Sequence, residues 1–150
     1  MSPLSVGEMA PAIGGIDFAG GPFGLFFYKV TCETCQMSAP KMRAFEDAYP
    51  GRVIGIGQDP DSKLALFTQE YEMGIGSIQD PPPYVASDAY AIVSVPVLYL
   101  VDVDGRILES VGAWDRDGFN GVSARLAELT SSPAVVISTP GDGLPAFKPG

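Results

Sequence analysis

The chain has 150 residues, a net charge of −9 at pH 7, two cysteines and no histidine, and its length fits one domain with a real hydrophobic core. Its nine basic residues are scattered, so neither nucleic acid nor a membrane surface is an expected partner. The lack of histidine excludes Cys-His and Ser-His catalysis, and two cysteines alone cannot complete a four-ligand zinc site, so no cofactor or metal is expected.

The first twenty residues are expected to be irregular. Residues 1–17 hold no Lys or Arg and no long apolar run, so they do not have the pattern of a signal peptide. The longest apolar run of the chain, residues 91–101, is interrupted by Ser94 and Pro96 and is too short to span a membrane. We therefore expect a cytoplasmic protein. Glycine pairs predict turns here, with one short edge strand near residues 13–18.

A strand predicted over residues 25–30 leads directly into the only two cysteines, Cys32 and Cys35. The strand is indicated by a continuous apolar and aromatic run. Residues 36–49 then place apolar side chains at helical spacing, and Pro50-Gly51 ends this helix. Because proline removes a hydrogen bond inside a helix, Pro40 is expected to divide it into segments 32–39 and 41–49.

A Cys-x-x-Cys pair at a strand-to-helix junction has a specific chemical use. The first sulfur lies at the helix N-terminus, where unpaired N–H groups and the helix dipole favour a thiolate. The second lies one turn further in, within reach of a disulfide. Since the thiolate is the reactive form, Cys32 is the predicted nucleophile and Cys35 its resolving partner. In a reducing cytosol such a pair is more often redox-active or metal-binding than structural.

The rest of the chain alternates between strand and helix patterns. The expected elements are, in order, a strand over residues 52–58, a helix over 63–73 after capping residues 59–62, a loop or weak strand over 77–85, a short helix over 87–92, a strand over 97–103, an antiparallel strand over 106–111 and a helix over 118–129. This order predicts an α/β fold with a mixed sheet and helices on both faces.

From residue 131 the composition changes to Pro, Gly and Ser, so the sequence divides into a domain over residues 1–130 and a tail over residues 131–150. Residues 140–150 are expected to be extended and either weakly held or disordered. The apolar segment 144–147 could dock on the domain or bind a partner. Trp114 is expected to pack in the core, and with Asp115 it could instead border a substrate groove.

Three features of the chain occur together: the strand–Cys32-Glu33-Thr34-Cys35–helix unit with Pro40, the sequence Val93-Ser94-Val95-Pro96-Val97, and the hairpin over residues 98–107. Together they resemble the thioredoxin superfamily, in particular its thiol-disulfide reductases and the redoxin domains related to peroxiredoxins. Residues 93–97 are similar to the family's cis-proline loop. The resemblance covers residues 5–130 and implies a thioredoxin-like fold, with a central mixed sheet, helices on both faces and one inserted helix over residues 63–73.

The resemblance also implies a substrate site around the cysteine pair. Pro96 would lie across from the cysteines with a cis peptide bond before it, and the main chain of Val95 would pair with a substrate chain. A trans proline that merely starts a strand is the alternative. Glu33 and Thr34, between the cysteines, would complete the substrate-binding residues. The expected protein is a monomer that acts on protein disulfides in cell redox homeostasis and is reset by an external thiol reductant.

The chain departs from the family pattern at several positions. Thr31 stands where an aromatic residue usually precedes the first cysteine, and Glu33-Thr34 replaces the common Gly-Pro pair. Phe26 occupies the strand position where thioredoxins carry a buried carboxylate that moves protons for the second cysteine. The sequence names no replacement for this acid.

These departures bear on the pKa of the nucleophile. The negative charge of Glu33 opposes a thiolate at Cys32 and offsets part of the helix-dipole effect, whereas the ammonium group of Lys29 could act in the opposite direction. We therefore predict a Cys32 pKa nearer neutral than strongly acidic, and a reducing rather than an oxidising protein.

Two other functions remain open beside the oxidoreductase. In a peroxiredoxin-like peroxidase, Thr or Ser stands three residues before the reactive cysteine and proline stands further upstream, but this chain has Lys29 and Leu25 there. A non-catalytic module for metal binding or docking is the second alternative, because two thiolates suit a soft metal such as Cu(I). Neither a histidine nor a methionine cluster supports it.

Overall fold

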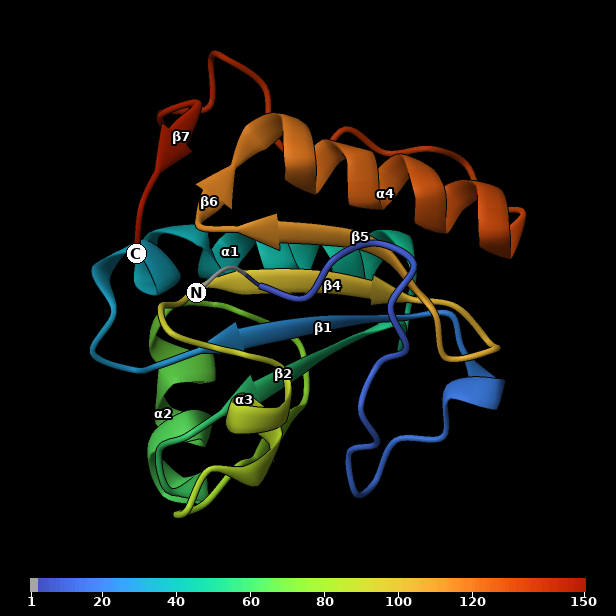
Figure 1. Ribbon diagram of the computed structural model, residues 1–150. Helices are drawn as coiled ribbons and strands as arrows, with labels where there is room; N and C mark the ends of the chain where they lie inside the picture. Colours follow the sequence, from blue (N-terminus) through green and yellow to red (C-terminus); the bar gives the residue numbers. More distant parts are fainter. Residues whose placement is uncertain (1–2) are drawn as a thin grey trace.

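The structure, a computed structural model, describes residues 3–150 and is built around one five-stranded mixed sheet in the order β3-β2-β1-β4-β5 (Figure 1). The central strand β1 (Phe23–Tyr28) is parallel to β2 (Val53–Gly57) and antiparallel to β4 (Val97–Val101). The edge strands are β3 (Ser77–Gln79), parallel to β2, and β5 (Ile107–Gly112), antiparallel to β4. The predicted mixed sheet and closing hairpin are confirmed.

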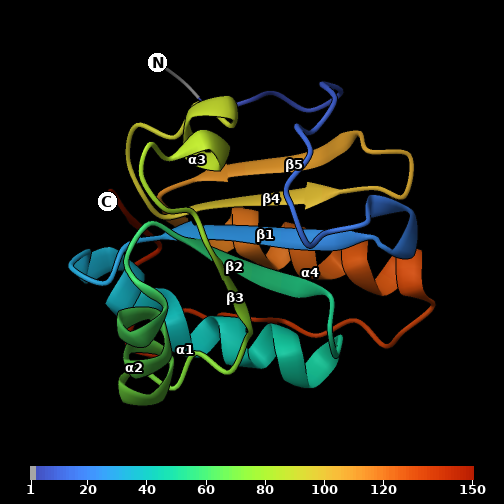
Figure 2. The same cartoon turned by 90° about the horizontal axis from the view of Figure 1, so that it is seen from below.

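Helices cover both faces of the sheet, as predicted (Figure 2). On one face lie α1 (Glu33–Ala48), α2 (Asp61–Glu70) and α4 (Arg116–Thr130), and on the other lies the short α3 (Val85–Ala89). The β1-α1-β2 and β2-α2-β3 connections step in the same direction across the sheet, so right-handed crossovers place both helices on one face. No helix within residues 3–150 is long and apolar enough to cross a membrane.

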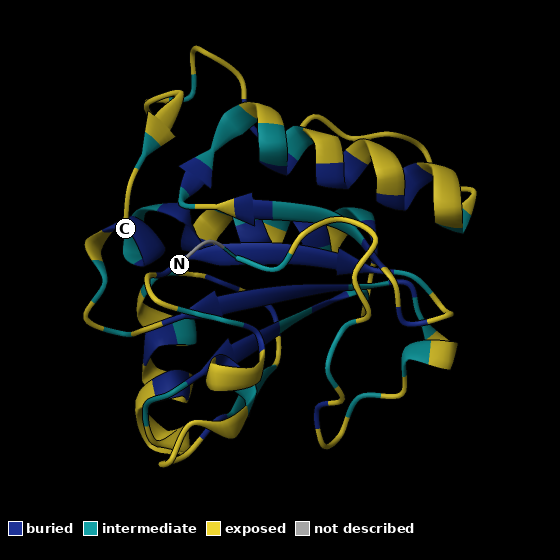
Figure 3. Ribbon diagram, in the orientation of Figure 1, coloured by how far each residue is buried: buried dark blue, intermediate teal, exposed yellow. Residues whose placement is uncertain are grey.

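The central strands are buried on both faces, which their continuous apolar sequence requires (Figure 3). On the face of α1 and α2, the ring of Phe26 stacks on that of Tyr28 with 5.7 Å between centroids. On the opposite face, the ring of Phe27 lies 5.1 Å from that of Tyr90 in the loop after α3. Position 26 therefore belongs to a fully buried aromatic cluster.

The helix α1 continues through Pro40, so the predicted division into two segments is wrong. Proline removes one main-chain hydrogen bond at this point. Residues on either side of it, Ala39, Met42 and Phe45, are fully buried against the core. Their packing keeps the chain helical where local propensity alone favours a break.

The N-terminal segment pairs with the edge of β5 instead of forming a strand near residues 13–18. The N–H of Gly7 donates to the carbonyl of Ile107 at 2.8 Å, and the N–H of Ile107 donates to the carbonyl of Glu8 at 2.9 Å. Further along, residues Phe18–Gly20 form a 3₁₀ turn. The segment thus covers a sheet edge that would otherwise present unpaired groups.

The tail over residues 131–150 returns along α1 and α4 (Figure 2). The side-chain oxygen of Asn120 accepts the N–H groups of Ile137 and Ser138 at 2.9 and 3.0 Å, and its amide nitrogen donates to the carbonyl of Ser138 at 2.8 Å. Ile137 and Ser138 are both buried. One side chain of α4 therefore fixes two consecutive residues of the tail.

Asp142 fixes the next part of the tail. Its carboxylate lies 2.8 Å from the ammonium of Lys41 and 3.6 Å from the guanidinium of Arg116, and it accepts the hydroxyl of Ser138 at 2.6 Å. The hydrogen bond from Lys41 is the main reason that the pKa of Asp142 is lowered below its usual range. Arg116 also donates to the carbonyl of Leu144 at 2.7 Å.

Beyond this anchor, β7 (Phe147–Lys148) pairs antiparallel with β6 (Trp114–Asp115) in a separate two-stranded ladder. The expectation that residues 140–150 are weakly held or disordered is therefore wrong. Their attachment depends on Lys41, Arg116 and Trp114, which are remote in sequence, so the composition of the tail does not reveal it.

Replacing Asp142 with alanine is expected to loosen residues 140–148 and to leave the sheet intact, because one carboxylate is the shared partner of Lys41, Arg116 and Ser138. Amide hydrogen exchange followed by mass spectrometry measures this as faster exchange in the tail and unchanged exchange in β1 and β4. The control is Asp47→Ala, which removes an exposed ion pair of α1. Tail exchange at the wild-type rate in Asp142→Ala would contradict the assigned anchor.

Candidate active site

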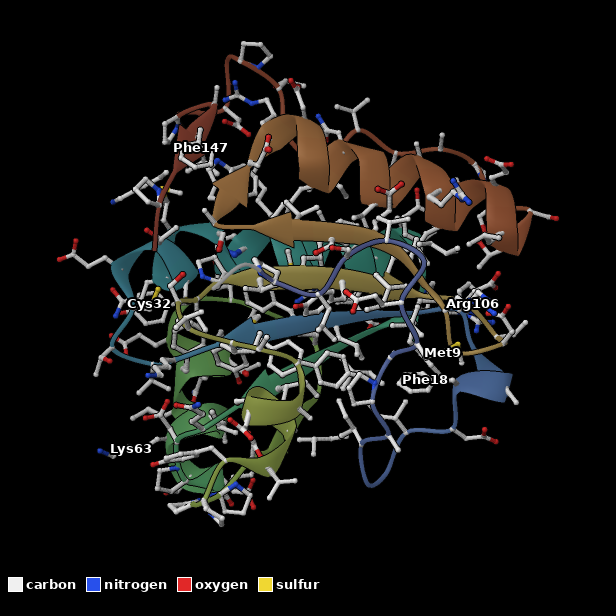
Figure 4. The ribbon with its side chains drawn as sticks, in the orientation of Figure 1. Met9, Phe18, Cys32, Lys63, Arg106 and Phe147 are labelled. Carbon is white, nitrogen blue, oxygen red and sulfur yellow. The ribbon has the colours of Figure 1, made fainter. Side chains whose placement is uncertain are left out.

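Cys32 is the N-cap residue of α1 (Figure 4). Its backbone is extended, with φ −82° and ψ 114°, and its sulfur accepts the N–H of Cys35 at 3.1 Å. Both cysteines are free thiols, Cys32 partly exposed and Cys35 buried. The first-turn N–H groups of the helix thus point at the accessible sulfur, as predicted from the spacing.

The Cys32 sulfur is set to ionise near neutral pH. The hydrogen bond from the Cys35 thiol, as the largest cause, lowers the pKa of Cys32 to about 6, while burial acts in the opposite direction. Main-chain N–H groups of Cys35 and Thr34 and the charge of Lys148 lower the pKa further. This agrees with the predicted pKa nearer neutral than strongly acidic. The contributing cation is Lys148, in the tail, rather than Lys29.

The Cys35 sulfur has the opposite character. Burial is the main reason that the pKa of Cys35 is raised, and the hydrogen bond and charge of Cys32 raise it further. At neutral pH Cys35 is therefore a thiol that donates its proton toward the Cys32 thiolate. Once Cys32 carries no charge, as in a mixed disulfide, its contribution is lost and the pKa of Cys35 falls.

Alkylation of Cys32 by iodoacetamide is expected to follow a titration with its midpoint near pH 6, because only the thiolate reacts and the pKa is lowered to about 6. Mass spectrometry across a pH series measures the rate at this residue. In Cys35→Ala the largest cause of the lowered pKa is gone, so the midpoint should move upward. A wild-type midpoint near that of an unperturbed cysteine, about 8.5, would contradict the assigned geometry.

The sign of the effect on stability follows from the same pKa. Because the folded-state pKa of Cys32 lies below the unfolded-state value, folding is favoured whenever the thiolate is present. The contribution is complete above about pH 8.5, the unfolded-state pKa, and it is lost as the pH falls through about 6. Urea unfolding of the reduced protein at pH 5.5 and 8 should therefore show more stability at the higher pH from this group.

The Val95–Pro96 peptide bond is cis, as the resemblance implied. The carbonyl oxygen of Val95 accepts the thiol of Cys32 at 3.5 Å, which places this loop directly beside the reactive sulfur. The carbonyl of Pro96 accepts the N–H of Ala113 at 2.9 Å and so ties the loop to the end of β5. The expected roles of Val95 and Pro96 in binding substrate remain predictions.

Two side chains hold the turn before Cys32, a role that the sequence analysis assigned to neither of them. The carboxylate of Asp59 accepts the N–H of Val30 at 3.0 Å, and the amide of Gln36 donates to the carbonyl of Val30 at 2.9 Å. Asp59 was expected to cap the following helix, but Pro60 is the N-cap of α2 and makes no side-chain cap bond. Asp59 therefore positions the approach to Cys32.

The two residues between the cysteines differ in their surroundings. Glu33 is exposed, whereas Thr34 is buried and its hydroxyl donates to the carbonyl of Pro149 at 2.7 Å. The tail therefore reaches the active site, a contact that the sequence did not predict. The sequence offered only the alternative that the apolar segment 144–147 docks on the domain.

Trp114 links the core to the tail. Its ring is fully buried and meets that of Phe119 edge to face, with 4.7 Å between centroids. The indole N–H donates to the carbonyl of Pro145 at 2.8 Å. The expectation that Trp114 packs in the core is confirmed, and its polar edge fixes the tail just before β7.

A pocket of about 440 Å³ opens over the reactive cysteine. Its walls come from the start of α1, the proline loop and the tail; the residues are Thr31, Cys32, Glu33, Thr34, Ser94, Val95, Lys148, Pro149 and Gly150. Four of the predicted site residues are thus brought together around one opening. Cys35 and Pro96 lie next to them in the chain.

Comparisons with known proteins identify the fold. No protein-family model matches the sequence, and no curated protein does. The thioredoxin domain of a thiol-disulfide oxidoreductase from Bacteroides vulgatus matches with a TM-score of 0.70 and 23% identity, over 82% of this chain and 99% of that one. A thiol:disulfide interchange protein from Bacteroides sp. matches with a TM-score of 0.67 and 22% identity, over 82% and 91%.

A secreted disulfide oxidoreductase from Mycobacterium tuberculosis also matches, with a TM-score of 0.60 and 24% identity, over 71% of this chain and 83% of that one. These similarities show that the chain has a thioredoxin-like fold, and the predicted fold class is confirmed. The helix α2 lies between the second strand and the proline loop, where the inserted helix was expected.

Proposed function

We propose that this protein is a thiol-disulfide oxidoreductase that reduces disulfides in polypeptide substrates. The observation that carries the proposal is the paired environment of the two sulfurs. Cys32 is accessible, lies at a helix N-terminus and has its pKa lowered to about 6, while Cys35 is buried one turn away and holds its proton. One sulfur is suited to attack and the other to resolve. The similarity in fold to known oxidoreductases supports this.

The reaction proceeds in two exchanges. The Cys32 thiolate attacks one sulfur of the substrate disulfide; a bond forms to Cys32, the substrate bond breaks, and the leaving thiolate takes a proton from solvent. Cys35 then gives up its proton to solvent and attacks the Cys32 sulfur, which breaks the mixed disulfide and releases the second substrate thiolate. The substrate gains two electrons, the pair becomes a disulfide, and an external thiol reductant restores it by the reverse exchanges.

The surroundings of the pair order these steps. Before attack, burial and then the hydrogen bond and charge of Cys32 raise the pKa of Cys35 and keep it protonated, so the resolving sulfur does not compete. Formation of the mixed disulfide removes the contribution of Cys32, so the pKa of Cys35 falls toward the range in which it can attack. Residues Glu33, Thr34 and Val95 line the pocket through which a substrate reaches Cys32, and Pro96 follows Val95, which supports their proposed role in binding substrate.

A reducing direction follows from the moderate pKa. In strongly oxidising thiol-disulfide oxidoreductases, the nucleophilic cysteine has a pKa of about 3.5, and its stable thiolate favours the reduced form of the protein. The pKa of about 6 for Cys32 stabilises its thiolate much less. The disulfide between Cys32 and Cys35 therefore forms more readily than the disulfide of such oxidising proteins, and the protein gives electrons to its substrates.

The test is catalysed reduction of a protein disulfide. With dithiothreitol as the reductant, the protein should accelerate the reduction of insulin and should do so over many turnovers. Hydrogen peroxide should be consumed no faster than by an ordinary thiol. Rapid consumption of peroxide that depends on Cys32 and survives loss of Cys35 would identify a peroxidase instead, and stoichiometric Cu(I) binding without insulin reduction would identify a metal-binding module.

A further inference from the structure

Residues 147–150 are held beside the active-site pocket through their main chain. β7 pairs with β6 through the residue pairs Asp115–Phe147 and Trp114–Lys148. The hydroxyl of Thr34 donates to the carbonyl of Pro149 at 2.7 Å. The ring of Phe147, by contrast, is 57% exposed (Figure 4). The domain thus binds this segment as an extended backbone, with little use of its largest side chain.

The same segment reaches the atoms that surround the reacting sulfur. A Cβ atom on Gly150 would overlap the carbonyl oxygen of Val95, the same atom that accepts the Cys32 thiol. Lys148, Pro149 and Gly150 form one wall of the pocket over Cys32. The backbone of the tail therefore lies in contact with the proline loop, where only a residue without a side chain fits.

A disulfide within a polypeptide substrate needs the surface beside Cys32. Its sulfur must approach Cys32 for attack, and the main chain on each side of that sulfur must lie along the surface next to it. On the side of Thr34 and Val95, residues 148–150 lie against this surface and form a wall of the pocket. A small disulfide brings no main chain, and Cys32 remains partly exposed to it.

Resting on the proposed function, we propose that Thr34, Val95 and the edge of β6 form a groove that binds the extended main chain next to a substrate disulfide, and that residues 147–150 occupy this groove as a tethered substrate mimic. A polypeptide substrate must displace the mimic by strand exchange at β6. The tightest position, opposite Val95, accepts only glycine.

The rest of the tail can stay in place during this exchange. The anchors at Asp142, Leu144 and Pro145 all precede β7, and they involve Lys41, Arg116 and Trp114 rather than the groove. Displacement therefore breaks only the short β6–β7 ladder and the contacts of Thr34 and Val95. The tether keeps the mimic close, so it competes with substrate at a high effective concentration.

The experiment compares two full-chain variants and one shortened chain. Gly150→Val should expel the residue that meets Val95, whereas Gly141→Val is the matched control, because nothing lies within 4 Å of a Cβ at that exposed glycine of the same tail. A chain ending at Ala146 removes the whole mimic and keeps the anchors. Each protein is assayed with dithiothreitol for the reduction of insulin and of bis(2-hydroxyethyl) disulfide.

Gly150→Val and the shortened chain are expected to raise kcat/KM for insulin about three- to tenfold, mainly through KM, as removal of a mostly docked competitor does. The ratio of insulin to small-disulfide activity should rise with it, and Gly141→Val should match the wild type. Unchanged ratios in both variants, with both substrates still reduced, would overturn the mimic and leave the proposed function standing. Failure of the wild type to reduce either disulfide would overturn both.

If the shortened chain does not fold, Gly150→Val against Gly141→Val decides the question, because both glycines are exposed positions of the tail. Loss of Lys148 in the shortened chain also removes a charge that lowers the pKa of Cys32. That change acts on both disulfides alike, so the ratio of activities isolates the groove.

Discussion

Replacing Cys32 with serine is expected to reduce insulin turnover to the rate of dithiothreitol alone, and replacing Cys35 with serine is expected to stop the reaction at a mixed disulfide. Cys32 is the accessible sulfur with a pKa lowered to about 6, whereas Cys35 is buried and serves only to resolve. Turnover is measured with insulin, and the trapped species is measured by mass spectrometry as a covalent adduct on Cys32.

The control for both variants is Asp47→Ala, which alters an exposed position on α1 away from the pair. It should retain wild-type turnover. An adduct that accumulates in Cys32→Ser, or full turnover in Cys35→Ser, would reverse or remove the roles assigned to the two sulfurs.

Replacing Trp114 with alanine is expected to destabilise the protein by about 3–5 kcal/mol, as is usual for removal of a large buried aromatic side chain. The ring is fully buried against Phe119, and its N–H holds the carbonyl of Pro145 at 2.8 Å. Urea unfolding of the reduced protein measures the loss. Trp114→Phe keeps most of the apolar contact and loses only the donor, so its loss should be smaller, about 1–3 kcal/mol.

Val136→Ala provides the comparison for a surface position, because this side chain is exposed in the same tail. Its effect should stay within about 0.5 kcal/mol. If Trp114→Ala had the same free energy of unfolding as Val136→Ala, the indole would not join the core to the tail.

The sheet and its covering helices could be predicted because their signals are local. The apolar run of β1 marks a strand buried on both faces, and Asp104-Gly105 marks the turn of the closing hairpin. Pro40 shows the limit of such signals. Its local effect predicts a break, but the burial of Met42 and Phe45 against the core outweighs that effect and α1 continues.

The positions of the two sulfurs could be predicted from their spacing, whereas their surroundings could not. The interval between Cys32 and Cys35 fixes both sulfurs on the first turn of one helix, so the proposed nucleophile could be named from the sequence. The contact of Thr34 with Pro149 joins residues 115 positions apart. No local pattern carries that information, and the composition of the tail favoured disorder, so the position of residues 148–150 beside Cys32 and the effect of the Lys148 charge became visible only in the fold.

The central claim is that Cys32 and Cys35 form a reversible dithiol–disulfide couple, and its most direct test is the redox potential of the pair. The protein is equilibrated in dithiothreitol buffers of defined ratio, and free thiols are trapped and counted. The expected result is a single two-electron transition with a midpoint of roughly −200 to −270 mV. A pair that stays reduced at every poise would contradict the claim, because two sulfurs that never join cannot exchange a disulfide.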